Sequence, residues 1–269
     1  MRLINQQPSL GARYTLACLP FIILLVVYFM GSEARLAINP DDKLLPSFGQ
    51  MAQTLKQYAF EENVRTGTYL FWDDTLASLR RLLMAMAIAT ALALVVGVAL
   101  GAVPVFAASF SAFVAVVSMI PPLAILPILF IVFGLEELSK VMLIVLGVAP
   151  VMIRDLEQRA RDIPREWIIK VQTLGANSWT AILRVVVPQL LPKLFIALRL
   201  ALGTAWLFLI AAEAIASTDG LGYRIFLVRR YMAMDVILPY VAWITLLAWL
   251  MDSLLKRLTA RLFPWYGGQ

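Results

Sequence analysis

Few side chains in this chain could carry out chemistry. The sequence has no histidine and one cysteine, Cys18, among 269 residues. The lack of histidine excludes a Ser-His-Asp triad, an HExxH zinc site and a histidine proton relay, and one cysteine offers neither a disulfide framework nor a cysteine metal site. Glu213 stands out because it ends a long apolar run, where a carboxylate usually faces a cavity or an ionic partner. It is predicted either to line a water-filled pathway or to pair with Arg224 or Arg199.

Prolines form the second unusual group, because Pro121, Pro122 and Pro127 interrupt an apolar segment. Proline removes a backbone donor, so these residues could free carbonyl oxygens toward a pore. They could equally kink a helix for packing, and both interpretations stay open. Glu136 and Glu137 follow, and we expect them to be solvated charges, or contacts for a partner, on a short outer loop.

The composition decides the class of protein that positions these residues. The chain is 61% hydrophobic and 15% charged, and its mean hydropathy is +0.83. These values indicate an all-α integral membrane protein. The net charge of +6 is explained by membrane orientation rather than by nucleic-acid binding, because membrane proteins keep lysine and arginine on their cytoplasmic side.

About six segments are apolar enough to cross a membrane as helices, which takes roughly 20 residues each. They lie near residues 14–30, 82–103, 111–133, 141–153, 191–212 and 236–251. The first has the flanks of a signal sequence but no convincing cleavage site, so we interpret it as a retained anchor. The second contains Gly97 and Gly101, a pair of small residues that suits close helix packing.

The lysines and arginines predict the orientation. They gather between residues 154 and 190 and in the C-terminal tail. The segment before the second span is instead rich in acids, such as Asp41 and Asp42, and has few basic residues, of which Arg65 is one. The positive-inside rule then puts both termini in the cytoplasm, although Arg224, Arg229 and Arg230 oppose this orientation. The predicted regions are a cytoplasmic N-terminus with its anchor helix (1–31), a periplasmic segment (32–76), a five-helix core (77–257) that includes a cytoplasmic loop (154–190), and a cytoplasmic tail (258–269).

The cytoplasmic loop is polar and amphipathic, and its pattern predicts two short helices. One spans about Pro164 to Thr173, with the proline in its first turn, and the other spans about Ser178 to Val187. Gly175 lies between them, where a turn needs positive φ, and Pro188 marks where the second helix must bend into the next span. The loop could lie among lipid headgroups with Trp179 as its anchor, or it could dock onto a cytoplasmic partner.

This loop resembles the one shared by permeases of bacterial ABC importers, whose pattern is E-A-A, three residues, G, nine residues, I-x-L-P. Gly175 matches the glycine, and Val185, Val187 and Pro188 occupy the I-x-L-P positions after the required nine residues. The E-A-A positions hold Ile169–Val171, which departs from the family pattern. The chain therefore lacks the glutamate of that pattern and any contact that this glutamate normally makes.

Further stretches in the same order resemble the nitrate, sulfonate, taurine and bicarbonate branch of these permeases. They are residues 118–140, 173–176, 186–206 and 219–225. The resemblance extends from about residue 44 to residue 251. Residues 39–47, 69–81 and 226–249 are similar to members associated with urea-carboxylase-type nitrogen metabolism, which favours guanidine or a related small nitrogen compound as the substrate.

The resemblance implies a type I ABC importer permease fold with a cytoplasmic coupling helix, in a multi-pass protein of the bacterial inner membrane. It also implies four partners: a dimer of ATP-binding subunits, a second permease that is either another copy in a homodimer or a close relative, a periplasmic or lipid-anchored substrate-binding protein, and membrane lipid. The chain contains no GxxxxGK[ST] motif, so ATP and Mg²⁺ would belong to the ATPase. We expect no cofactor, metal or nucleic acid in this chain and no enzymatic activity of its own.

The resemblance implies contact with the ATPase for Thr173, Leu174, Gly175, Ala176, Asn177, Ser178, Trp179, Ala181, Arg184 and Pro188. The candidates for a translocation pathway are the prolines and the carboxylate described above, Pro121, Pro122, Pro127 and Glu213.

Two other classes of protein are alternatives. A self-sufficient secondary transporter or channel would often show paired internal repeats, and none relates the two halves of the sequence. A membrane enzyme would need a cluster of nucleophiles, carboxylates or histidines inside the membrane, and the apolar segments carry only isolated ones.

Overall fold

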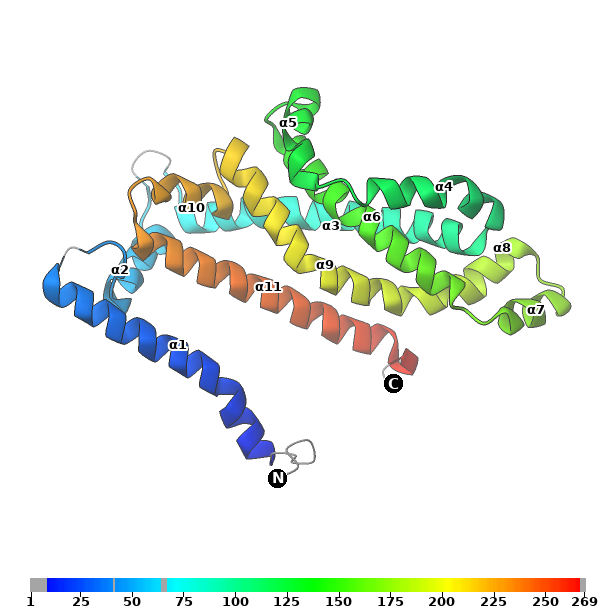
Figure 1. Cartoon of the computed structure of the whole chain (residues 1–269), viewed down its shortest axis with the longest axis horizontal. Helices are drawn as coiled ribbons and strands as arrows, with labels where there is room; N and C mark the ends of the chain where they lie inside the picture. Colours follow the sequence, from blue (N-terminus) through cyan, green and yellow to red (C-terminus); the bar gives the residue numbers. More distant parts are fainter. Residues whose placement is uncertain (1–8, 41, 64–66, 267–269) are drawn as a thin grey trace.

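The computed structural model describes residues 9–40, 42–63 and 67–266, and it forms helices and connecting turns throughout these ranges (Figure 1). The first eight and last three residues of the predicted terminal regions lie outside the described residues, as do Asp41 and Arg65. The five longest helices are α1 (Leu10–Ile38), α3 (Leu70–Ala102), α6 (Glu137–Arg161), α9 (Val187–Ala216) and α11 (Met234–Leu262). The shorter ones are α2 (Phe48–Phe60), α4 (Pro104–Val117), α5 (Pro122–Phe133), α7 (Arg165–Thr173), α8 (Ser178–Ala181) and α10 (Leu221–Arg229).

Four helical stretches are long and apolar enough to cross a membrane, or five if the bent pair α4 and α5 counts as one span. The four are 11–38, 70–102, 178–216 and 234–262. The fourth predicted span, residues 141–153, lies inside α6. That helix has 25 residues, enough to cross about 30 Å of hydrocarbon, but charged residues near both of its ends keep it outside this count.

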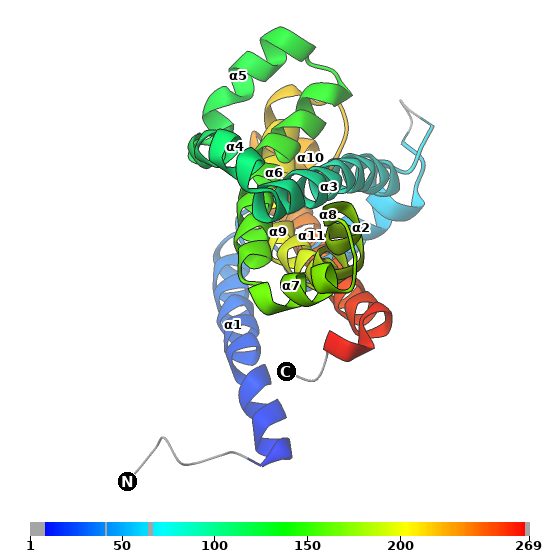
Figure 2. The ribbon, with the colours of Figure 1, turned by 90° about the vertical axis from the view of Figure 1, so that its right-hand side faces the viewer.

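The core forms where α3, α6 and α9 pack together. Gly97 and Gly101 of α3 face α6 so closely that an added Cβ at Gly101 would lie 2.2 Å from the Cβ of Ala160. The prediction of close packing at this pair is confirmed. Figure 2, which looks along the molecule, shows α1 apart from this bundle. Only 6% of the apolar window of α1 is buried, so its sides are open to lipid or to another chain.

The proline-rich segment is a sharp bend rather than a kinked span. The axes of α4 and α5 differ by 95° across it, and α5 projects from the bundle (Figures 1 and 2). Pro121 caps the start of α5 and Pro122 opens its first turn, positions where a missing N–H costs no helical hydrogen bond. Pro127 lies inside α5. The role of these prolines in a pathway stays a prediction.

The segment predicted to be periplasmic contains ordered structure, because it holds the end of α1, all of α2 and the start of α3. Ser47 begins α2 with a capping box, in which its hydroxyl and the side chain of Gln50 satisfy each other's backbone N–H groups. The N–H of Leu44 and the guanidinium of Arg35 bind the Asp42 carboxylate, which lowers the pKa of Asp42 below its usual value. The acid therefore stays ionised and holds the connection between α1 and α2.

Candidate functional site

The predicted coupling segment begins with a tight turn after α7. Gly175 adopts a φ of +88° there, in the region that glycine enters without a Cβ penalty. The N–H of Gly175 donates to the carbonyl of Gln172 at 2.9 Å, and the N–H of Ala176 donates to that of Val171 at 3.2 Å. The turn thus satisfies carbonyls that the end of a helix leaves free. The predicted positive φ is confirmed.

The second helix of the segment starts as predicted at Ser178. Asn177 is its N-cap, and the Oδ1 atom of Asn177 accepts a hydrogen bond from the N–H of Thr180 at 2.8 Å. The first helix differs slightly from the expectation, because Pro164 precedes α7 as its cap residue instead of lying in its first turn. Both short helices of the loop are nevertheless present.

Pro188 does not mark a break between helices. It lies in the first turn of α9, and the chain is helical from Ser178 to Ala216. A π-helical turn at Ile182–Val186 precedes it, in which the N–H of Val187 donates to the carbonyl of Ile182. Proline offers no N–H and its ring crowds the carbonyl four residues earlier. The wider turn accommodates this constraint, so the helix continues through the proline.

Most of the coupling residues lie on the surface, as contact with a partner requires. Leu174 is 80% exposed and Trp179 is 67% exposed. Thr173, Asn177, Ser178 and Arg184 are also exposed, and Ala176, Val187 and Pro188 are half-buried. Ala181 is different, because it is only 3% exposed. Its side chain packs inside the protein while its neighbours face outward, and its implied contact with an ATPase stays a prediction.

Glu213 lies in a closed ionic network. Its side chain is fully buried and accepts hydrogen bonds from the hydroxyl of Ser78 at 2.8 and 2.9 Å, from Nη1 of Arg81 at 2.8 Å and from the N–H of Gly222 at 2.9 Å. Buried carboxylates need this kind of compensation. The structure supports the ion-pair alternative for Glu213 but with Arg81 as the partner. A role in the pathway remains a prediction.

Arg81 connects three carboxylates from separate parts of the chain. Its side chain is 2% exposed, and it binds Glu137 with two parallel hydrogen bonds of 2.6 and 2.7 Å. It also bonds Glu213 and the carboxylate of Asp219, while Lys140 bonds Glu137 at 3.1 Å. Glu137 therefore lies at the start of α6 in an ion pair instead of free on a loop, and 42% of its side chain stays exposed. A contact of Glu137 with a partner stays a prediction.

The two arginines named as possible partners of Glu213 are paired elsewhere. Nε of Arg224 lies 2.7 Å from the Asp74 carboxylate, which also accepts from Tyr240 at 3.2 Å. Arg199 binds Asp252 with two hydrogen bonds of 2.8 and 2.9 Å. The pairing with Asp74 also gives a reason for Arg224, which opposes the orientation that the positive-inside rule predicts.

One face of α3 presents the polar groups of this network. Asp74, Ser78 and Arg81 are four and three residues apart, so they lie on one side of the helix. They meet α9 and the loop that leads into α10, and we name the whole group the Arg81 cluster: Asp74, Ser78, Arg81, Glu137, Glu213, Asp219 and Arg224. The helical spacing of these polar residues within DDTLASLRR (residues 73–81) was a signal in the sequence that they share one face of a helix.

Glycines allow the loop before α10 to approach the cluster. Gly220 has a φ of +110°, and a Cβ added there would lie 2.5 Å from the carboxyl carbon of Glu213. At Gly222 an added Cβ would lie 2.8 Å from the carbonyl oxygen of Ile210. The backbone N–H of Gly222 can reach Glu213 only because neither position carries a side chain. The loop is thus part of the ionic network and not a free connection.

The arrangement defines a membrane-spanning helical subunit with an exposed two-helix segment at one end and a buried ionic cluster at the other. A protein-family model described as "Binding-protein-dependent transport system inner membrane component" matches residues 89–267, which is more than half of the chain. The chain belongs to this family, and it is therefore an ABC transporter permease subunit of the multi-pass type.

Two curated relatives and one solved structure show how far the similarity extends. The taurine transport system permease protein TauC of Escherichia coli (strain K12) is 33% identical over 96% of this chain and 92% of its own length. The bicarbonate transport system permease protein CmpB of Synechocystis sp. is 28% identical over 75% of this chain and 71% of its own length. A chain of the MetNI methionine ABC transporter, in an inward-facing conformation, aligns with a TM-score of 0.63 and 20% identity over 72% of this chain and 96% of its own length. This last likeness confirms the type I ABC importer permease fold.

Proposed function

We propose that this chain is the transmembrane subunit of an ATP-driven importer for a small solute of the taurine, sulfonate or bicarbonate type. The observation that carries the proposal is the 33% identity to a taurine permease along almost the whole chain. The chain would form the pathway, and a binding protein would deliver the solute at the end that holds α2 and α10. Hydrolysis of ATP would take place in a separate subunit that also holds Mg²⁺.

The exposed segment at the opposite end gives this proposal its mechanical element. Leu174 and Trp179 present apolar surface next to the turn at Gly175, and exposed apolar groups of this kind mark an interface with a partner or with lipid. In the proposal they enter a groove of a cytoplasmic ATPase, with both termini of the chain on the same side of the inner membrane. Two copies of the chain would serve two ATPase subunits, because a homodimer presents this segment twice.

Guanidine, which the sequence resemblance favours, is a second candidate solute. The names of the two relatives instead denote solutes that carry an oxyanion, a sulfonate in taurine and bicarbonate itself. The two possibilities differ in the group that would be recognised, an oxyanion in taurine and bicarbonate and a cation in guanidinium, so one uptake measurement separates them.

Uptake into proteoliposomes tests the proposal. The chain is reconstituted with its ATPase and its binding protein, and taurine, an alkanesulfonate, bicarbonate and guanidinium are supplied in turn. We expect uptake of at least one of the oxyanions that requires both ATP and the binding protein. Uptake without ATP, driven by an ion gradient, would instead identify a secondary transporter and overturn the proposal. ATP-dependent uptake of guanidinium alone would keep the importer and replace its solute.

A tryptophan substitution tests the docking step separately. Trp179→Ser removes the exposed indole from α8, and Trp265→Ser removes one of nearly equal exposure, 65%, from the C-terminal turn. We expect Trp179→Ser to lower the amount of ATPase retained by the permease on size exclusion by about ten-fold, as for a central interface tryptophan, while Trp265→Ser leaves it unchanged. Equal retention in both variants would show that Trp179 anchors the segment in lipid.

A further inference from the structure

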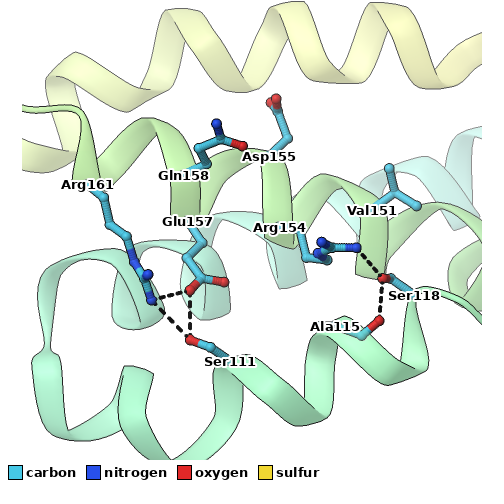
Figure 3. A pocket seen from close by; sticks show the side chains of 9 residues that line it. All are labelled: Ser111, Ala115, Ser118, Val151, Arg154, Asp155, Glu157, Gln158 and Arg161. Atoms are coloured by element: carbon cyan, nitrogen blue, oxygen red, sulfur yellow. Dashed lines mark hydrogen bonds and ion pairs between the residues drawn. The ribbon is translucent and has the colours of Figure 1, made fainter.

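A polar pocket opens between α4 and α6, away from the Arg81 cluster (Figure 3). It has a volume of about 580 Å³. Ser111, Ala115 and Ser118 line it from α4, and Arg154, Glu157 and Arg161 are among the residues that line it from α6. Hydroxyl, amide and charged groups on two helices of a membrane protein usually face water or a partner rather than lipid. The pocket is thus a candidate for a part of the pathway.

The acids of the pocket are already neutralised. Glu157 accepts from Nη2 of Arg161 at 2.5 Å and from the hydroxyl of Ser111 at 2.7 Å. Asp155, which also lines the pocket, binds Nε of Arg159 at 2.6 Å. Each carboxylate therefore has its own arginine, and neither leaves a net negative charge for a solute.

Arg154 is the cation left over. Its guanidinium donates to the hydroxyl of Ser118 at 2.9 Å, and within the described part of the chain it forms no ion pair with a carboxylate. Figure 3 shows the side chain pointing along the pocket toward Ser118 and away from Arg161. The pocket thus contains one arginine that no carboxylate pairs with among the described residues, and this arginine has free hydrogen-bond donors.

The position of Arg154 argues against an arginine that only reaches for lipid headgroups. It lies seven residues before the end of α6 at Arg161, which is about 10 Å along a helix. Side chains that snorkel extend toward the nearer membrane surface, whereas this one donates to Ser118, the residue that caps the end of α4. A charge in such a place needs a water-filled cavity or a ligand.

We infer that Arg154, with the hydroxyl of Ser118 beside it, forms an anion-binding station in the translocation pathway, which accepts the oxyanion head of a sulfonate- or bicarbonate-type solute. This inference rests on the proposed function and names the charge of the solute. Arginine suits the task because its planar fork donates to two oxygens of one oxyanion. A guanidinium solute would be repelled at the same place.

Thiol labelling tests the station without depending on any solute. Ala115→Cys places a thiol in the pocket, in a Cys18→Ala background because Cys18 is exposed. Gln57→Cys in α2 serves as a reference thiol at the surface. Both variants are assembled with the ATPase in nanodiscs, and each is labelled with an anionic sulfonatoethyl and a cationic trimethylammonioethyl methanethiosulfonate.

We expect the ratio of anionic to cationic labelling rates at position 115 to exceed that at position 57 by about five-fold or more, from the field of an unpaired arginine nearby. Arg154→Gln should abolish this preference. Arg257→Gln, which removes the same charge from an exposed site on α11, should leave it intact. No reaction at position 115, equal ratios at both positions, or a preference that survives Arg154→Gln would each overturn the inference.

Uptake adds a second readout. Arg154→Gln should lower the amount of taurine transported per ATP hydrolysed by about ten-fold, as when one bidentate contact to an oxyanion is lost, and Arg154→Lys should retain a larger part of it. Unchanged transport per ATP in Arg154→Gln would contradict the station. If the unsubstituted complex transports none of the four solutes of the uptake test, the proposed function fails. The labelling ratios would then still decide whether the pocket selects anions.

Discussion

Arg81 holds together the helices at the end of the molecule that lies opposite the coupling segment. It joins α3 to α6 through Glu137, to α9 through Glu213 and to the following loop through Asp219. A buried charge is costly unless it is paired, so the loss of one partner destabilises much more than the pair itself stabilises. Arg81 therefore fixes how three segments sit against α3, and its partners should differ in importance according to their burial.

Glu213→Gln should destabilise the protein by about 3 kcal/mol, because it removes the fully buried one of the three carboxylates that compensate the charge of Arg81. Glu137→Gln is the matched control, since it removes a carboxylate from the same arginine at a side chain that is 42% exposed. Its effect should be less than half as large. Thermal unfolding of each purified permease, followed by size exclusion, measures the difference. Wild-type stability in Glu213→Gln together with altered uptake would favour the role in the pathway.

Gly175 sets the path of the coupling segment through its backbone conformation and not through lack of space. An added Cβ would meet no atom within 4 Å, but the φ is +88°. Gly175→Val should therefore reduce binding-protein-stimulated ATP hydrolysis by about five-fold or more, because a β-branched residue is strained at positive φ. Gly175→Asn should retain most of it, because asparagine tolerates this region. The same loss in both variants would mean that any side chain obstructs the contact.

At the scale of elements, the contact between α3 and α6 organises the core. Gly97 and Gly101 bring the helices close enough that a Cβ at Gly97 would lie 2.9 Å from the Cβ of Leu156. Small residues of this kind allow dispersion contacts along the whole interface, which matter in a membrane because lipid is as apolar as the side chains. The charged ends of α6 are tolerated because α6 is covered by α3 and α9 and faces lipid only in part.

Gly101→Ala should weaken this interface by about 1–3 kcal/mol, because the new methyl group would overlap Ala160 and push the helices apart. Gly203→Ala in α9 is the control, since an added Cβ there meets nothing within 4 Å. The midpoint of thermal unfolding in detergent should fall in the first variant only. A similar midpoint in both would show that α3 and α6 can separate slightly at no cost.

For the whole molecule, the described helices place two functional ends far apart. The coupling segment lies at one end with α7 and α8, and α2 and α10 lie at the other with the Arg81 cluster between α3, α6 and α9 (Figure 1). A contact with an ATPase and a contact with a binding protein would thus be made at opposite surfaces, and the long helices that join them would transmit the coupling.

Cysteine labelling determines which end faces which compartment. Asn177→Cys and Gln53→Cys, each in a Cys18→Ala background, place thiols at exposed positions of the two ends. A membrane-impermeant reagent added outside spheroplasts should label Gln53→Cys and not Asn177→Cys, because the arginine-rich loop is expected in the cytoplasm. Labelling of Asn177→Cys from outside would refute both the orientation and the proposed docking to an ATPase.

The sequence by itself determined the features that depend on neighbours a few residues away. These are the long apolar helices, the positive φ of Gly175, the presence of the two short helices and the small pair in α3. Periodicity, turn chemistry and helix capping act over one or two turns, so the local sequence contains the information they need. The break at Pro121 and Pro122 was visible in the same way, although its angle was not.

Only the tertiary structure decided which charged residues form ion pairs and which helix faces pack against each other. Glu213 pairs with Arg81, which is 132 residues away, and no local pattern indicates which of several arginines a buried acid will meet. The burial of Ala181 and the pocket around Arg154 likewise arise where helices pack whose order in the chain does not reveal their contacts. An ion pair forms between whichever charges the packing of apolar helices brings together, because an unpaired charge cannot remain buried.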